Sequence, residues 1–243
     1  NKRAFLWGRI LAEKPELADE ILSGVVAPPP LSLDALIATR AEALISYQNR
    51  AYADRYRSAM AAVIDAESRV FGEPGRLSRA AAEGLYRVMA YKDEYEVARL
   101  HAAADYADGA VFHLSPPVIA RMDPLTGRRK KVAVPGWIAL PLFRLLRHGK
   151  RLRGTGFDPF GSQAERQAER SLIGQYMDDL RTIAGALRTD NADVAIGLAN
   201  LPDMIRGFGP VKDANRAKAE VQRKVLLDRL RAPAPVQPAM AAE

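Results

Sequence analysis

Apolar residues recur three or four positions apart in several long stretches of this sequence, and this spacing constrains the fold more than any other feature. One face of an α-helix repeats at that interval, because the helix has about 3.6 residues per turn. The stripes are Tyr52, Tyr56, Met60 and Val63; Leu85, Val88, Tyr91, Tyr95, Ala98 and Ala102; Leu172, Tyr176, Leu180 and Ile183; and Val194, Leu198, Leu201 and Ile205. The pattern predicts a mainly α fold of about five to seven helices, whose apolar stripes form the core.

Glycine and proline separate the helical stretches. Residues 1–22 are typical of a helix interrupted at Pro15, and the prolines at 28–30 predict an extended linker. Further helices are expected over residues 33–70, 78–104, 162–187, 194–205 and 211–231. The last twelve residues are rich in Pro and Ala and are predicted to be disordered. The chain is therefore expected to have three parts: residues 1–24, a helical domain over residues 25–231, and a tail over residues 232–243.

One segment carries a β signal. Short apolar runs at residues 117–120 and 131–134 flank residues 123–127, whose sequence is typical of a turn. We therefore expect one small β-hairpin near residues 117–134. A short apolar helix over residues 137–147 is predicted to follow it.

Positive charge is concentrated in one part of the chain. The sequence holds 36 Lys and Arg against 29 Asp and Glu, a net charge of +7. Residues 121–153 contain ten basic residues and one acid, Asp123, so the rest of the chain is slightly acidic. Such a segment predicts either a surface for an anionic partner or a solvated basic surface with no partner. The candidate anion- or partner-binding residues are Arg128, Arg129, Lys130, Lys131, Arg144, Arg147, Lys150, Arg151 and Arg153.

The composition and the motifs exclude several functions. Because the chain has no cysteine, it cannot form a disulfide, use a thiolate nucleophile or hold an iron–sulfur cluster by thiolates. A P-loop and a Gly-x-Ser-x-Gly nucleophile elbow are both missing from the sequence. The glycine pairs at 154–156 and 207–209 are interpreted as turns between helices, with at least one glycine of each at positive φ. No apolar run is long enough to span a bilayer and no signal peptide is recognisable, so we expect a cytoplasmic protein without membrane contact.

The sequence contains no arrangement typical of catalysis. Lys92, Glu96 and Arg99 share one side of a predicted helix and favour an ion-pair ladder over a carboxylate activated between two cations. The three histidines fall on separate elements without metal-ligand spacing: His101, His113 and His148. A catalytic role for His113 or for the ladder stays open. We expect no catalytic residue and no metal site in this chain.

Five strings of residues occur in an order that matches one known family. They are Tyr47–Asn49 with Tyr52–Tyr56, Met89–Leu100, Phe112–Pro117, Arg153–Gly161 and Ile205–Lys212. Together they resemble the C-terminal region of the fused-chain indolepyruvate ferredoxin oxidoreductases, which are thiamine-dependent 2-oxoacid:ferredoxin oxidoreductases. Residues 1–9 resemble the end of a preceding γ-type oxidoreductase domain, so the resemblance covers about residues 1–231. The chain begins at Asn1 within helical sequence, and we expect it to be a piece of a longer protein.

The resemblance implies a parent enzyme that oxidatively decarboxylates an aryl pyruvate. Such an enzyme converts the 2-oxo acid and coenzyme A to an acyl-CoA and carbon dioxide, and passes the electrons to ferredoxin. Thiamine diphosphate, magnesium and iron–sulfur clusters supply this chemistry in the family. The present chain lacks both cysteine and the Gly-Asp-Gly string that binds thiamine diphosphate. No catalytic residue of the family therefore maps onto it, and we expect it to hold no cofactor itself.

Three interpretations of the function remain at this point. The preferred one is an accessory, non-catalytic helical domain that packs against the remainder of the parent chain or docks an anionic partner. Ferredoxin is favoured over the phosphates of coenzyme A, because a broad patch suits a protein and a nucleotide needs a compact pocket. An autonomous nucleic-acid-binding module is less favoured, since the two aromatics of the basic segment, Trp137 and Phe143, do not alternate with its arginines. An independent enzyme is disfavoured by the missing motifs.

Overall fold

The computed structural model describes residues 2–23, 29–107, 109–114, 131–207 and 209–233, without the side chains of residues 20 and 22. Its contacts divide the chain into two compact units, Asn1–Ser32 and Leu33–Glu243. The first unit contains two helices, α1 (Lys2–Glu13) and α2 (Glu16–Ser23). Three neighbouring apolar side chains of α1 are exposed: Phe5, Leu6 and Trp7.

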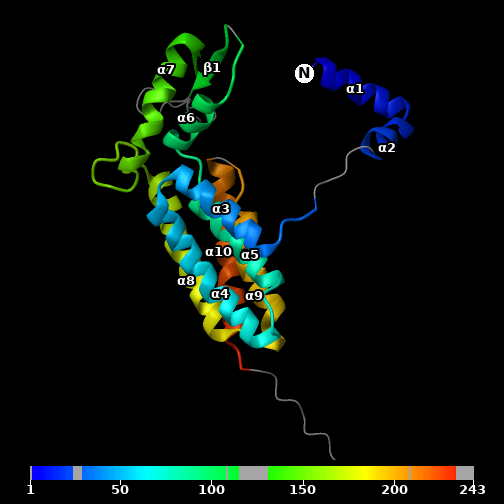
Figure 1. Cartoon of the computed structure of the whole chain (residues 1–243), viewed down its shortest axis with the longest axis vertical. Coiled ribbons are helices and arrows are strands. Elements are labelled where there is room, and N and C mark those ends of the chain that lie inside the picture. Colours follow the sequence, from blue (N-terminus) through cyan, green and yellow to red (C-terminus); the bar gives the residue numbers. More distant parts are fainter. Residues whose placement is uncertain (1, 24–28, 108, 115–130, 208, 234–243) are drawn as a thin grey trace, which may run out of the picture. The chain divides into compact units, whose positions relative to one another are not determined.

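The second unit is mainly helical, which confirms the predicted fold class. Six of its helices run alongside one another as a bundle (Figure 1). They are α3 (Leu33–Tyr47), α4 (Arg50–Phe71), α5 (Arg76–Met89), α8 (Ala164–Ala186), α9 (Ala192–Ala199) and α10 (Pro210–Arg231). Two short 3₁₀ segments precede and follow α9: η2 (Thr189–Asn191) and η3 (Leu201–Met204).

A smaller group of elements, here called the hairpin lobe, packs at one end of the bundle (Figure 1). It consists of α6 (Glu94–Ala103), β1 (Val111–Leu114), β2 (Val132–Pro135), α7 (Gly136–Leu146) and the 3₁₀ segment η1 (Arg147–Leu152). The two strands are antiparallel, with Phe112 opposite Val134. The lobe has its own small core, made by Ala98, Phe112, Ala139 and Phe143.

The bundle core is built from the stripes that the periodicity predicts. Tyr56, Met60 and Val63 of α4 are fully buried, and they share one core with Leu85 of α5 and Leu180 of α8. Burial of an aliphatic or aromatic side chain of this size contributes about 1.5–3 kcal/mol. The apolar faces of helices distant in sequence therefore hold the bundle together.

Helix α5 packs tightly against its neighbours at Gly84. A Cβ atom at this position would meet the hydroxyl of Tyr176 and would lie 2.6 Å from the carbonyl oxygen of Ala199. These two groups are themselves hydrogen-bonded, with the Tyr176 hydroxyl donating to the Ala199 carbonyl over 2.6 Å. Gly84 is therefore required by packing between helices.

Two helices that the periodicity predicts as continuous are each divided. The stretch over residues 33–70 is interrupted at Asn49, whose side chain accepts the backbone N–H of Tyr52 over 2.9 Å and caps α4. The stretch over residues 78–104 is interrupted before Asp93, whose carboxylate accepts the N–H of Glu96 over 2.8 Å and caps α6. Asn and Asp satisfy the free N–H groups of a new helix start, so they begin helices inside an unbroken apolar pattern. The described residues therefore contain ten α-helices, more than the five to seven predicted.

The β-hairpin is present, with a first strand that the sequence did not indicate. Strand β2 overlaps the predicted strand at 131–134, and its partner among the described residues is β1. The predicted first strand at 117–120 and the predicted turn at 123–127 lie outside the described residues. Phe112 explains the pairing, because its ring is buried against Phe143 with ring centroids 5.3 Å apart. A buried face specifies strand register strongly, because a slip by one residue would move the buried ring to the other face.

The two glycine pairs adopt the backbone conformation that was predicted. Gly154 has a φ of 77°, and Gly207 and Gly209 have φ values of 109° and 54°. These angles lie in the left-handed region, which glycine enters without a steric penalty. The prediction of at least one positive φ in each pair is confirmed.

Candidate functional site

Six of the predicted basic site residues lie within the described residues, in the hairpin lobe or beside it. Four of them are exposed and are here called the cationic rim: Lys131 before β2, Arg144 on α7, and Arg147 and Arg151 on η1. Residues 131–157 include no Asp or Glu. Of the six, Arg153 alone pairs with a described carboxylate. The predicted site residues Arg128, Arg129 and Lys130 lie outside the described residues.

Arg153 is buried in the fold, contrary to the expectation that it serves a partner, and Lys150 is half-buried with its ammonium bonded to the backbone. The ammonium of Lys150 donates to the carbonyl oxygen of Ser46 over 2.7 Å. Burial, together with the positive charges of Arg99 and Arg153, lowers the pKa of Lys150. Arg153 is 8% exposed and is engaged on several sides by the chain itself. Both cations are therefore removed from the candidate docking set, because their hydrogen bonds join η1 and the loop after it to α3.

Arg153 and Asp93 form the centre of a buried structural cluster. The guanidinium donates to both carboxylate oxygens of Asp93, over 2.5 Å and 2.9 Å, and to the Tyr47 carbonyl over 2.9 Å. It also lies over the ring of Tyr47 at 3.8 Å and nears the ring of Tyr95 at 5.7 Å. Burial raises the pKa of Tyr47, and the Asp93 carboxylate raises it further. Such a tyrosine stays protonated at neutral pH, so it packs around the ion pair and does not serve as a base.

Asp158 organises the glycine-rich loop that follows η1. Its carboxylate accepts the backbone N–H groups of Gly154 and Phe160, each over 3.1 Å. It also accepts the hydroxyl of Tyr95 over 3.0 Å, which ties the loop to α6. Backbone N–H groups in a glycine-rich loop are the usual ligands of a phosphate. Here the Asp158 carboxylate already accepts these N–H groups, so the hydrogen bonds of the loop stabilise its own conformation.

An apolar stripe on α7 is the part of the candidate site that the sequence did not single out. Successive residues of an α-helix are rotated by about 100°, so five apolar residues of α7 share an arc of about 140° on one side of the helix. In order around this arc they are Trp137, Pro141, Leu145, Ile138 and Leu142. All five are exposed, Trp137 by 77% and Leu145 by 72%. We call these five residues the α7 stripe. The opposite side of the helix carries Ala139 and Phe143, which are buried in the lobe core.

A sequence signal for the α7 stripe exists in retrospect. Helix α7 is apolar around most of its circumference, although it lies on the surface of a small lobe. A surface helix normally presents a polar side to water. An apolar helix that carries Arg144 near its end and is followed at once by Arg147 and Arg151 therefore indicates a second apolar contact, made outside the lobe.

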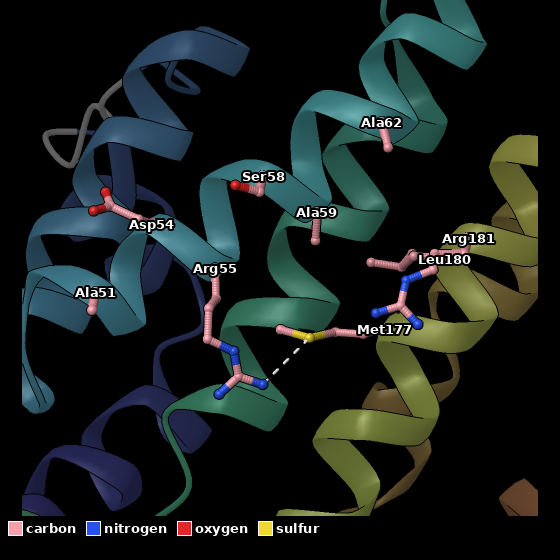
Figure 2. Close-up of a pocket in the computed structure, with 9 residues that line it drawn as sticks. All are labelled: Ala51, Asp54, Arg55, Ser58, Ala59, Ala62, Met177, Leu180 and Arg181. Carbon is pink, nitrogen blue, oxygen red and sulfur yellow. Dashed lines mark hydrogen bonds between the residues drawn. The ribbon is translucent and has the colours of Figure 1, made fainter.

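A groove of about 560 Å³ lies between α4 and α8 (Figure 2). Its floor is formed by Met177 and Leu180, and small residues such as Ala59 and Ala62 leave it open. Arg55 reaches across it and donates to the sulfur of Met177 over 3.8 Å. A thioether is a weak acceptor, and the carboxylate of the lining, Asp54, already accepts the Arg57 guanidinium over 3.0 Å, so the contacts of the groove do not favour acid–base chemistry.

The histidines are placed in three different surroundings. The ring of His101 stacks on Phe143 with centroids 5.0 Å apart, and its Nδ1 is hydrogen-bonded to the hydroxyl of Tyr106. His113 is exposed on β1, and His148 on η1 accepts a bond of 3.4 Å from the Arg147 guanidinium. Among the described residues, no three His, Cys, Asp or Glu side chains gather closely enough to hold a metal ion.

The predicted ladder on α6 is formed in part. Arg99 and Glu96 make an ion pair of 2.7 Å on neighbouring turns. Hydrogen bonding to Glu96 raises the pKa of Arg99 against the opposing effect of burial. Lys92, the third member, is exposed and precedes α6, outside the helix. The pair is a local helix contact and supplies no free carboxylate for catalysis.

Buried carboxylates elsewhere also have structural partners. Glu67 accepts the backbone N–H groups of Gly75, Leu77 and Ser78 at the start of α5, over 2.8–2.9 Å. Burial alone would raise the pKa of Glu67, but these hydrogen bonds lower it below its ordinary value. Asp179 pairs with Arg223 through two bonds of 2.7 Å, which join α8 to α10.

Comparison with known proteins identifies a family without assigning an activity. A family model described as a family of unknown function (DUF6537) matches residues 33–225, which is most of the chain. No curated protein and no solved structure matches the chain. Within the part of the chain that the structure describes, no helix is both long enough and apolar enough to cross a membrane.

Proposed function

The chain belongs to the DUF6537 family, a family of unknown function, and we propose that it is a non-catalytic docking domain for an acidic protein. The cationic rim is the observation that carries this proposal. Its four exposed basic side chains lie in a stretch, residues 131–157, that has no acid to neutralise them. Like charges held close together repel, and an acidic partner relieves that repulsion. Such a surface also accelerates encounter with an oppositely charged protein.

We place this domain in a larger cytoplasmic enzyme, an aryl pyruvate:ferredoxin oxidoreductase. The five sequence strings that resemble the C-terminal region of that family support the placement. Thiamine diphosphate would supply the carbanion chemistry and iron–sulfur clusters the electron transfer in other parts of the parent. The present chain does not fit the clusters, because it has no cysteine to ligate them.

Ferredoxin is the acidic partner in this proposal, and coenzyme A is the less favoured ligand. Arg144 and Arg151 lie on two successive elements of the lobe, and Lys131 precedes β2. This spread suits a protein surface, whereas a nucleotide needs cations that converge in a pocket. The glycine-rich loop after η1 could offer its backbone N–H groups to a phosphate, but the Asp158 carboxylate already accepts those of Gly154 and Phe160.

The buried ionisable groups favour a structural role over a catalytic one. Asp93 caps α6 and pairs with Arg153, and Glu67 satisfies the first N–H groups of α5. Each of these carboxylates binds the N–H groups at the start of a helix, and Asp93 also joins α6 to the loop after η1. A general acid or base needs a carboxylate or imidazole that can reach a substrate.

The docking role is tested by reversing three charges of the rim in the parent enzyme. We expect Arg144→Glu, Arg147→Glu and Arg151→Glu together to raise the KM for ferredoxin at low salt and to leave the KM for the 2-oxo acid unchanged. The effect should shrink as salt rises, because the Debye length falls from about 10 Å at 0.1 M to about 3 Å at 1 M. Initial rates of ferredoxin reduction measure both constants.

A matched variant controls for net charge. Lys218, Lys224 and Arg229 are exposed on α10, and their replacement by Glu makes the same change of charge on another surface. The α10 variant should keep the KM for ferredoxin within about twofold of its value in the unchanged enzyme. If the rim variant and the α10 variant behave alike, the docking proposal is wrong.

The placement in a parent enzyme has its own test. The native polypeptide that contains this sequence should be purified and sequenced by mass spectrometry, and assayed for indolepyruvate-dependent reduction of ferredoxin. We expect cysteine-rich and thiamine-binding sequence on the same chain. A native polypeptide without either would refute the placement and leave the docking domain to be explained separately.

A further inference from the structure

The α7 stripe lies beside the cationic rim and is not used by the fold. Arg144 follows Pro141 by three residues and Trp137 by seven, so it borders the stripe along the same side of the helix. Arg147 and Arg151 extend from the C-terminal end of α7 on η1. Apolar side chains and the Arg144 cation thus lie side by side on α7, and two further exposed cations follow on η1.

We infer that the α7 stripe is the apolar centre of a protein interface whose charged edge is the cationic rim, and that its occupant is an acidic protein with a short apolar ridge. This inference rests on the proposed docking function and adds which residues hold the bound partner. Protein interfaces commonly combine an apolar centre with a polar edge, and tryptophan and arginine are enriched among the residues that dominate binding. Trp137, Leu145 and Arg144 supply this combination.

The exposure of the α7 stripe argues that something covers it. Five apolar residues on one side of one helix make a contiguous apolar surface, which is larger than the pair of exposed valines on α10, Val221 and Val225. Contiguous exposed apolar patches on soluble proteins mark interaction sites. The buried side of α7, through Ala139 and Phe143, already secures the helix to the lobe, while Trp137 and Leu145 leave most of their surface uncovered.

Charge selects the kind of partner. A second copy of this chain, meeting the first through the same surface, would bring Arg144, Arg147 and Arg151 of both chains together. Like charges juxtaposed in an interface oppose association. An acidic partner places carboxylates against the rim while its apolar ridge contacts the stripe.

The geometry favours a protein over a lipid surface as the occupant. Helix α7 has 11 residues and is therefore about 16 Å long, which matches one helix or one ridge on a partner. It is held in place by a packed core on its other side, so the stripe is preformed. Preformed surfaces bind rigid partners at a low cost of ordering. Anionic vesicles are the competing occupant, and the experiment includes them.

The test separates the apolar centre from the charged edge by kinetics. Binding of the full-length protein to immobilised ferredoxin is measured by surface plasmon resonance at several salt concentrations. Trp137→Gln with Leu145→Gln should weaken binding about tenfold or more through faster dissociation, since buried aromatic anchors act mainly on residence time. The dependence of the association rate on salt should stay as in the unchanged protein, because the rim is intact.

Two controls make the result specific. Val221→Gln with Val225→Gln removes comparable exposed apolar side chains from α10 and should leave binding within about twofold. Polyglutamate, an acidic chain without apolar side chains, should bind the Trp137 and Leu145 variant as well as the unchanged protein. Circular dichroism should show the same helix content in every variant.

Each other outcome has a defined meaning. If the charge-reversed rim loses ferredoxin binding and the α7 variant does not, the inference fails and the proposed docking function stands. If the unchanged protein does not bind ferredoxin, both fail. If phosphatidylserine vesicles shift the fluorescence of Trp137, measured in a Trp7→Phe background, and ferredoxin does not, the occupant is a membrane surface and the inference is wrong.

Discussion

Arg153 and Asp93, which are 60 residues apart in the sequence, form a two-bond ion pair of 2.5 Å and 2.9 Å inside the protein. Their side chains are 5% and 4% exposed. Hydrogen bonding to Asp93 raises the pKa of Arg153 against the effect of burial, so the cation persists at any ordinary pH. The pair joins the loop after η1 to the start of α6, and Tyr47 adds the end of α3. The hairpin lobe is therefore attached to the bundle by this pair, together with the ion pair of 3.1 Å between Glu94 of α6 and Arg166 of α8.

Removing one member of this pair should destabilise the protein strongly. Arg153→Met leaves the Asp93 carboxylate buried without its cation, and such changes cost about 3–5 kcal/mol. Urea denaturation followed by circular dichroism measures the loss. Arg151→Met, an exposed neighbour, should stay within about 0.5 kcal/mol of the unchanged protein. Equal effects for the two variants would contradict a structural role for the pair.

Glu67 should make stability depend on pH in the acid range. Its pKa in the folded protein lies below the ordinary value of 4.5, because backbone N–H groups stabilise the carboxylate. The contribution is therefore complete above about pH 4.5 and is lost as the pH falls through the lower, folded value. Glu67→Gln should lower the free energy of unfolding at neutral pH by about 1–3 kcal/mol.

The difference in the free energy of unfolding between Glu67→Gln and the unchanged protein should become smaller as the pH falls. Urea midpoints measured across the acid range give this difference. Glu73→Gln, an exposed acid in the same connection, is the matched control and should give no such narrowing. A constant difference at every pH would show that the charge of Glu67 does not matter.

Gly84 and Gly174 should respond in opposite directions to the same substitution. Gly84→Ala places a methyl group against the Tyr176 hydroxyl and the Ala199 carbonyl, and overpacking of this kind costs about 1–3 kcal/mol. Gly174→Ala meets nothing within 4 Å on α8 and should stabilise the protein by about 0.5–1 kcal/mol, the helix-propensity difference. Thermal unfolding distinguishes the two signs. A stabilising Gly84→Ala would mean that α5 does not approach α9 as closely as described.

Gly207 should tolerate no branched side chain. Its φ of 109° disfavours any L-residue, and a Cβ would lie 2.9 Å from a methyl group of Val211. Gly207→Val is therefore expected to lower stability by about 1 kcal/mol or more. Gly156→Val is the control, since a Cβ there meets nothing within 4 Å. An unchanged melting temperature for Gly207→Val would contradict the positive φ.

The sequence was informative wherever the determining interaction is local. The stripe of Tyr56, Met60 and Val63 identifies a buried helix face because residues three and four apart share a side of any helix. The turn at Gly207 and Gly209 follows from the few residues that accept a positive φ. The helix starts at Asn49 and Asp93 are also local, but an unbroken apolar pattern concealed them. A capping residue begins a new helix without interrupting the apolar periodicity, so periodicity alone predicts one long helix.

The candidate site could be predicted only in part. The sequence identified a basic segment, but it could not distinguish Arg151, which is exposed, from Arg153, which is buried. Two arginines separated by one residue have the same chemistry, and only the position of Asp93 in space separates their roles. The α7 stripe likewise became visible when Ala139 and Phe143 were seen to occupy the other side of the helix.

The sequence by itself determined the helical character of the chain, the absence of thiolate chemistry and the concentration of positive charge, because each depends on composition or on spacing within a few residues. The tertiary structure alone decided which cations face water, which glycine is required by packing and which side of α7 is left uncovered. Those properties depend on contacts between residues far apart in the sequence, such as Gly84 with Ala199 and Asp93 with Arg153. Such contacts form only when helices pack, so a local pattern does not contain them.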